Sequence, residues 1–151
     1  MNGRSTVLQG GRAKAYRPLP EADRRAAYIA GIDAYGRGEF FEAHELLEPA
    51  WMGTADLAER DLHQGLIKLA AGYVHAVRGN PQGMLKNLRG ARERLAAVVT
   101  AGLPAIACHA DVPRVDVARL VAAIDERLTR LAATATVEPI DPPALTESRE
   151  D

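Results

Sequence analysis

The stretch "ERDLHQGLIKLAAGYVHAVRGNPQG", residues 59–83, decides the fold class of this chain. Its apolar side chains recur every three or four residues, which predicts one long helix over about residues 54–78. Gly79 is typical of a helix end, Asn80 is a favourable N-cap, and Pro81 suits the first position of a following helix. Because the connection is so short, the two helices should be antiparallel neighbours.

The same periodicity continues on both sides of this hairpin, and no strand pattern is convincing. The predicted helices cover residues 20–37, 39–52, 54–78 with Thr54 as N-cap, a fourth that starts at Pro81 and ends before Thr100, and a fifth that follows Asp116 as N-cap. Gly65 and Gly72 lie on one side of the third helix, which indicates close approach of a neighbouring helix. We therefore predict an all-α fold, a compact bundle of about five helices.

Composition limits the classes of function. The chain has 151 residues, enough for one domain, and its net charge of −1 gives no sign of a nucleic-acid partner. The single cysteine, Cys108, excludes an internal disulfide and favours a reducing compartment, while its neighbour His109 makes it a weak candidate for a reactive thiol or a metal donor. No apolar run approaches the roughly 18 residues of a membrane span. We expect a cytoplasmic protein without a membrane partner.

The two ends of the chain differ from the middle in composition. Residues 1–17 carry four basic and no acidic side chains, and residues 136–151 are acidic and rich in proline. Neither end holds enough apolar surface to offset the entropy lost on ordering. The sequence therefore predicts a flexible basic arm over 1–17, a helical domain over 18–135 and a flexible acidic tail over 136–151.

Two polar residues stand out in the predicted second helix, "FFEAHELLEPAW" (residues 40–51). At about 100° per residue, Phe41 and Trp51 fall within about 60° of His44, and so do Phe40 and Leu47. Glu48 lies one turn from His44, on the same face. This count places His44 and Glu48 in the middle of the core face. A buried carboxylate needs a hydrogen bond, an ion pair or a metal.

The segments "GEFFEAHELLEPAW" and "ERDLHQGLIKLAAGYVHAVRGNPQG" resemble the family of domain of unknown function number 309. The family motif, His-x3-Glu-x2-Trp/Tyr, corresponds here to His44, Glu48 and Trp51, and the resemblance extends over about residues 28–95. It implies a small all-helical fold and a suggested metal-binding role for the motif, and it implies no reaction. Pro49 departs from the expected pattern, since proline removes a helical hydrogen bond and should bend the helix or end it early.

Three hypotheses explain His44 and Glu48. In the first they bind a divalent metal such as zinc, manganese or iron, with His63 and Glu59 of the third helix as further ligands and Glu45 as a base beside a metal-bound water. In the second the pair performs acid–base chemistry in a dry pocket without metal. In the third they form a structural polar network that fixes the helix register.

A different class of function is equally open. The stretch "AYGRGEFFEAHELLE" resembles the helical hairpin of a tetratricopeptide unit, with a small-residue turn followed by an aromatic residue. No second or third copy follows at a fixed period, so a repeat array is not expected. The similarity still favours a non-catalytic helical interaction module that binds a protein partner or a second copy of the chain.

Overall fold

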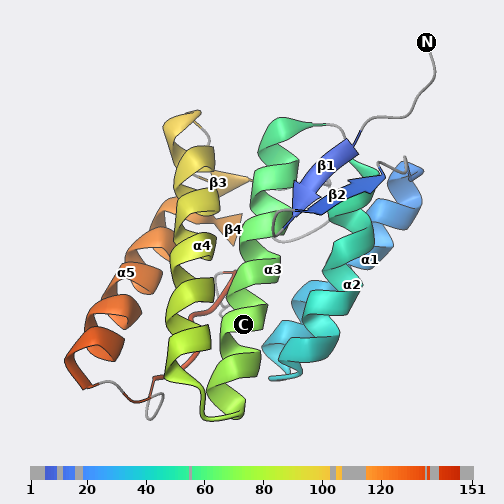
Figure 1. Cartoon of the computed structure of the whole chain (residues 1–151). Coiled ribbons are helices and arrows are strands. Elements are labelled where there is room, and N and C mark those ends of the chain that lie inside the picture. Colours follow the sequence, from blue (N-terminus) through green and yellow to red (C-terminus); the bar gives the residue numbers. More distant parts are fainter. Residues whose placement is uncertain are drawn as a thin grey trace, which may run out of the picture.

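Five α-helices make up most of the described part of the chain (Figure 1), which confirms the predicted all-α bundle. The computed structural model describes residues 19–54, 56–102, 115–134, 136 and 140–146, and the backbone alone of 6–9, 12–15 and 105–106. The helices are α1 (Glu21–Gly36), α2 (Phe40–Gly53), α3 (Leu57–Val77), α4 (Pro81–Thr100) and α5 (Val117–Thr134). Each lies within a few residues of its predicted position.

Two short antiparallel strand pairs accompany the helices, and the expectation of no strand is wrong for them. They are β1 (Thr6–Gln9) with β2 (Arg12–Ala15), and β3 (Ala105–Ile106) with β4 (Val115–Asp116). Strands of two to four residues are too short to show an alternating pattern in the sequence. The first pair falls inside the predicted basic arm 1–17, whose other residues lie outside the described part of the chain.

The starts of three helices test the predicted caps. The side chains of Asn80 and Asp116 accept hydrogen bonds from main-chain N–H groups three residues on, as expected of N-caps. For α3, however, Thr54 is not the cap: the Asp56 carboxylate accepts from the N–H of Glu59 at 3.0 Å. Asp and Thr are both good caps, and the two-residue difference shortens the helix without changing its direction.

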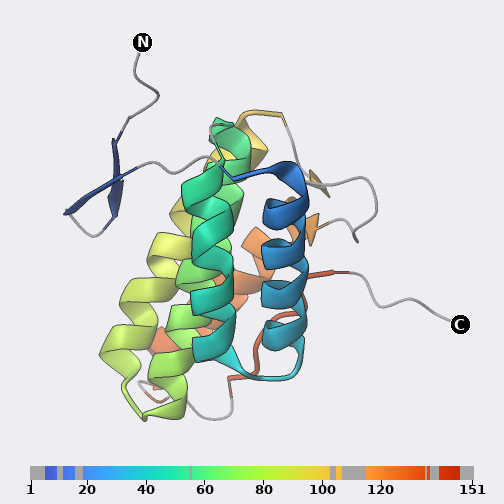
Figure 2. The same cartoon turned by 90° about the vertical axis from the view of Figure 1, so that its right-hand side faces the viewer.

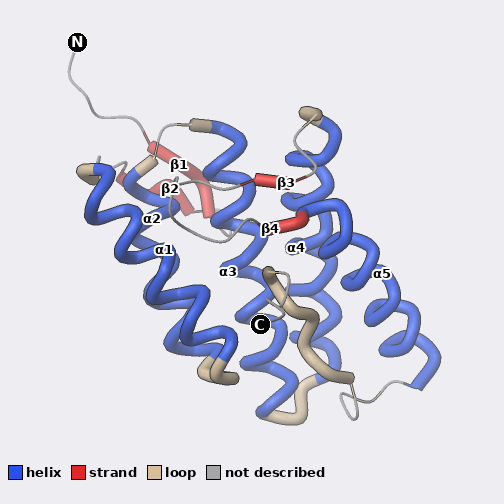
Figure 3. Tube along the Cα trace, turned by 180° about the vertical axis from the view of Figure 1, so that it is seen from behind, coloured by secondary structure: helices blue, strands red, loops and turns tan. Residues whose placement is uncertain are grey.

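Successive helices pack mainly against their neighbours in the chain. The helix pairs in extensive contact are α1–α2, α2–α3, α3–α4 and α4–α5. Figures 1 and 2 show α2, α3 and α4 side by side, with α1 behind α2 and α5 behind α4. Seen from behind, α1 and α5 stand on the two sides of the bundle, and a C-terminal segment runs between them (Figure 3).

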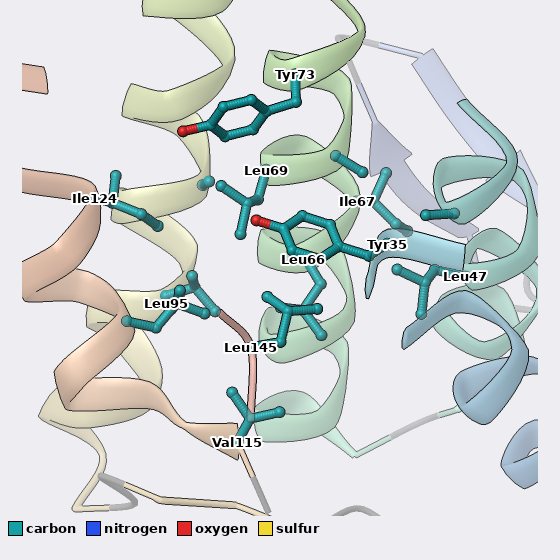
Figure 4. Close-up of a cluster of buried hydrophobic side chains, with 14 of the residues drawn as sticks. Tyr35, Leu47, Leu66, Ile67, Leu69, Tyr73, Leu95, Val115, Ile124 and Leu145 are labelled. Carbon is teal, nitrogen blue, oxygen red and sulfur yellow. The ribbon is translucent and has the colours of Figure 1, made fainter. Parts of the chain in front are cut away.

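The central helix, α3, is buried on nearly every side. Its buried residues are Leu62, His63, Gln64, Gly65, Leu66, Ile67, Leu69, Ala70, Gly72 and Tyr73. The predicted close approach at its glycines is confirmed, because a Cβ on Gly65 would lie 2.6 Å from Cγ of Leu95 on α4. Figure 4 shows the resulting core, in which Leu66, Leu69 and Leu95 lie between the helices.

Residues 140–146, named here the C-terminal strap, complete the core from the back of the bundle. Ile140 and Leu145 are only 7% and 6% exposed, and Pro143 is buried as well. Residues 140–146 of the predicted tail 136–151 thus place two aliphatic side chains in the core. Two aliphatic side chains are enough to close a gap that α1 and α5 leave open, and no composition average over the tail reveals them.

Candidate functional site

The core face of α2 differs from the predicted one. Its buried side chains are Ala43, Leu47, Ala50 and Trp51, whereas Phe41 is 59% exposed. The core face is thus centred near Leu47, not on His44. The small side chains of Ala43 and Ala50 let the flanking helices approach α2 closely on this side. Close helix approach, and not the size of the aromatic side chains, therefore decides which side of α2 is buried. Trp51 is in the core, as predicted.

His44 consequently lies at the edge of the core. Its ring stacks against that of Phe41, with centroids 6.4 Å apart and planes at 15°. Its Nδ1 is 3.3 Å from a carboxylate oxygen of Glu45, and the two side chains are 28% and 58% exposed. The motif histidine is therefore half-buried and reachable from solvent.

Glu48 is half-buried and lies one turn along α2 from His44. Together with Glu45 it lines a surface hollow of about 340 Å³, whose other walls are Leu19, Pro49 and Met52. The two carboxylates and the His44 ring thus share the outer edge of α2. The side chains of the family motif are presented to solvent at this edge, apart from Trp51.

The two candidate ligands on α3 have other surroundings. His63 is fully buried and packs edge-on against the ring of Tyr28, with centroids 5.4 Å apart. Glu59 accepts a hydrogen bond from Arg24 at 3.3 Å and one from the Thr54 hydroxyl at 3.5 Å. Burial raises the pKa of the Glu59 carboxyl, and the positive charge of Arg24 opposes that rise.

The four predicted metal ligands do not lie together in the structure. The structure does not bring His44 and Glu48 together with His63 and Glu59, and within the described ranges no three His, Cys, Asp or Glu side chains are grouped as a metal would require. The four residues therefore do not fit one metal centre. Arg24, which the sequence analysis did not single out, is the partner of Glu59. Cys108 and His109 lie outside the described residues.

The geometry also bears on the metal-free hypothesis and on the role of Glu45. His44 does not lie in a dry pocket, because its side chain is 28% exposed, and the side chain of Glu45 is more exposed still. In such surroundings water screens the pair and competes for its hydrogen bonds. The partner that the structure places beside the imidazole is Glu45, the next residue along the chain.

Pro49 neither ends nor interrupts α2, which continues to Gly53. Proline at this position cannot donate the helical hydrogen bond to the carbonyl of Glu45. Both residues are exposed, so water can satisfy that carbonyl. The expectation that Pro49 ends the helix early is wrong for this reason, and Trp51 keeps its place in the core.

A second hollow, which the sequence analysis missed, lies between the start of α2 and the end of α3. We call it the apolar hollow; its volume is about 450 Å³. Its lining residues are Phe40, Phe41, Val74 and Val77, with Gly38, Glu39, Glu42 and Arg78 at the rim. Phe41 and Val77 are 59% and 77% exposed. Exposed apolar side chains that line one depression are typical of a contact surface.

Residues 28–87 match the family model described as "Domain of unknown function (DUF309)". This middle part of the chain is therefore similar to the DUF309 family. The match runs from the middle of α1 into the start of α4 and contains His44, Glu48, the apolar hollow and the turn between α3 and α4. Comparison of the chain with curated proteins and with solved structures found no match.

Among the residues that the structure describes, no helix combines the length and the apolar character needed to cross a membrane. The core residues of α3 are instead covered by α2 and α4.

Proposed function

We propose that this protein is a non-catalytic helical interaction module that binds a protein partner at the apolar hollow. The observation that carries the proposal is the exposure of Phe41 and Val77 on a shared depression. Removing large apolar side chains from water is favourable, so a partner that covers them gains binding free energy.

The rim of the hollow indicates the kind of partner. Glu39 and Glu42 are acidic and Arg78 is basic, so both signs of charge surround an apolar floor. This is the anatomy of a protein interface, with an apolar centre and a polar edge. A basic surface, as nucleic acid requires, is not formed by these residues. We therefore infer that an apolar side chain of a protein segment occupies the hollow.

The helix order supports the same proposal. Helical interaction modules are assembled from antiparallel hairpins that contact mainly their neighbours, and α1–α2 and α3–α4 are two such hairpins packed through α2 and α3. Such an array presents helix ends and edges on its surface. The apolar hollow lies where the turn that precedes α2 meets the end of α3.

Site-specific photocrosslinking in the native host tests this proposal. A benzophenone amino acid in place of Phe41 should give one discrete protein adduct, and the same amino acid in place of exposed Ala118 on α5 serves as the control. The adduct should disappear when Val77→Asp is added, because a charge in the hollow repels an apolar side chain. Equal adducts at both positions, or an adduct that survives Val77→Asp, would show that the hollow is not the docking site.

A divalent metal is the second candidate ligand, and it concerns the outer edge of α2. His44 and Glu48 lie one turn apart, both are partly exposed, and the Glu45 carboxylate is beside the imidazole. Such a pair is a workable half of a site for zinc, manganese or iron, whose remaining ligands would come from water or a partner. His63 and Glu59 are not ligands of this proposed metal site.

Thermal unfolding with added metal tests this second candidate. A metal at 100 times its dissociation constant should raise the free energy of unfolding by about 2.7 kcal/mol. His44→Ala and Glu48→Gln should each abolish the effect, whereas His75→Ala should not, because His75 lies on α3 beside Asn80. If His75→Ala abolishes it as well, or if wild type ignores all three metals, the candidate fails.

A further inference from the structure

The C-terminal strap is held chiefly through its main chain. The hydroxyl of Tyr35 on α1 donates to the carbonyl of Pro143 at 2.8 Å, and that of Tyr73 on α3 donates to the carbonyl of Asp141 at 2.9 Å. Nε of Arg127 on α5 donates to the same Asp141 carbonyl at 2.7 Å. We call the surface formed by Tyr35, Tyr73 and Arg127 the strap groove; the first two are labelled in Figure 4.

Three donors aimed at main-chain carbonyls select an extended segment. In a helix those carbonyls already accept hydrogen bonds, so a helical ligand could not use them. Prolines at positions 142 and 143 suit this groove because they favour an extended backbone, and the buried Pro143 brings no N–H that would need a partner. The groove therefore recognises an extended, proline-containing backbone.

Side chains add selectivity to this backbone recognition. Nη2 of Arg127 donates to the Asp141 carboxylate at 3.1 Å, and Arg130 donates to it at 3.4 Å. Ile140 on one side of the aspartate and Leu145 four residues after it are buried. An aliphatic residue, an aspartate, two prolines, one further residue and a leucine thus make up the recognised pattern.

The strap leaves part of the groove empty. A cavity of about 190 Å³ remains between it and α5, and Ala144 lines it together with Arg119, Leu120 and Ala123. The methyl group of Ala144 is the smallest side chain that the position could carry short of glycine. A segment with a larger residue there would make contacts that the protein's own strap cannot make.

We propose that the strap groove is a binding site for an extended segment of a partner protein, and that residues 140–146 occupy it in cis as a substitute ligand. The partner segment carries the pattern aliphatic–Asp–Pro–Pro–x–Leu, with a residue larger than alanine at x. Because the strap belongs to the same chain, its effective concentration is high, and a partner must bind more tightly than the strap to displace it. The inference concerns a surface other than the apolar hollow and does not depend on it.

The test keeps the whole chain and converts the strap into a separable ligand. A protease recognition sequence is inserted after Thr136, the intact protein is folded, and the link is then cut. A fluorescent peptide of residues 138–147 is added, and its anisotropy reports exchange with the cut strap. The matched probes carry Asp141→Asn or Ala144→Leu, so that the protein itself is unchanged in these comparisons.

The expected result is saturable exchange that follows the groove chemistry. The Asp141→Asn peptide should bind about twofold to fivefold more weakly, since it loses the exposed ion pairs with Arg127 and Arg130, and the Ala144→Leu peptide about fivefold to tenfold more tightly. Both Arg127 and Arg130 donate to this carboxylate, so the Arg127→Ala/Arg130→Ala double variant of the protein should bind the wild-type and Asp141→Asn peptides alike. A cut strap that does not exchange, a chain that unfolds on cutting without rescue by peptide, or binding that ignores position 141 would each overturn the proposal.

Discussion

The Tyr35 hydroxyl on α1 donates a 2.8 Å hydrogen bond to the main-chain carbonyl of Pro143, which lies 108 residues further along the chain. The first helix of the bundle is thereby joined to its last described segment. Tyr73 on α3 makes the same kind of bond to Asp141, two residues away on the strap. Since α1 and α5 are not extensively packed against each other, the strap and these tyrosines hold the back of the bundle together.

Removing either hydroxyl should destabilise the fold. Tyr35→Phe leaves the buried carbonyl of Pro143 without its donor, and we expect a loss of about 1–3 kcal/mol in the free energy of unfolding by urea. Thr129→Ala is the matched control, because that hydroxyl bonds only to a carbonyl of its own helix on the surface. Its effect should stay within about 0.5 kcal/mol. Equal effects of the two substitutions would show that the strap contributes nothing.

The same two tyrosines predict a loss of stability in alkali. Burial raises the pKa of Tyr73 to about 12, and burial also raises the pKa of Tyr35 well above its ordinary value. The folded protein therefore retains protons that the unfolded chain releases near pH 10, so stability is fully present below about pH 10 and falls as pH rises toward 12. The Tyr35→Phe/Tyr73→Phe double variant should start less stable and show a shallower fall over this window, followed by urea unfolding at each pH. An equally steep fall would assign the pH dependence to other groups.

The helix contacts of α3 predict opposite results for two glycine substitutions. Gly65→Ala places a methyl group 2.6 Å from Cγ of Leu95, so α3 and α4 must separate, at a cost of about 1–3 kcal/mol. Gly36→Ala meets no atom within 4 Å and should be neutral or stabilise α1 by up to about 1 kcal/mol. Thermal melts of both variants check this difference. A Gly65→Ala chain as stable as wild type would contradict the close approach.

The two ends of α2 should respond differently to loss of an aromatic ring. Trp51 is 2% exposed, and Trp51→Ala should cost about 3–5 kcal/mol. Phe41 is 59% exposed, and Phe41→Ala should change the stability of the isolated protein by no more than about 0.5 kcal/mol. Denaturant titrations that gave a large loss for Phe41→Ala would place its ring in the core after all.

Local sequence determined the helices and most of their ends. The helical hairpin of α3 and α4 follows from Gly79, Asn80 and Pro81, and Asn80 caps α4 as those residues predict. The family resemblance also followed from local motifs, since the matched range 28–87 lies within the range 28–95 over which it was expected. Caps, turn residues and helical periodicity act over a few neighbouring positions, and a sequence displays such short-range effects directly.

Which face of each helix is buried was decided by the tertiary structure. The periodicity of α2 places Phe41 and His44 on the same side as Leu47, yet the flanking helices cover Leu47 and leave Phe41 exposed. Gln64 on α3 has a polar side chain, yet it is buried because neighbours surround this central helix. A helical wheel gives the angle between side chains but not the directions from which neighbouring helices approach.

The C-terminal strap also depends on tertiary structure alone. Its seven residues have no periodic pattern, and their average composition suggests an unpacked tail. They are held because α1, α3 and α5 bring Tyr35, Tyr73 and Arg127 to one groove. The strap accepts hydrogen bonds mainly through its main-chain carbonyls, which every residue possesses. The identity of its side chains therefore could not predict these bonds.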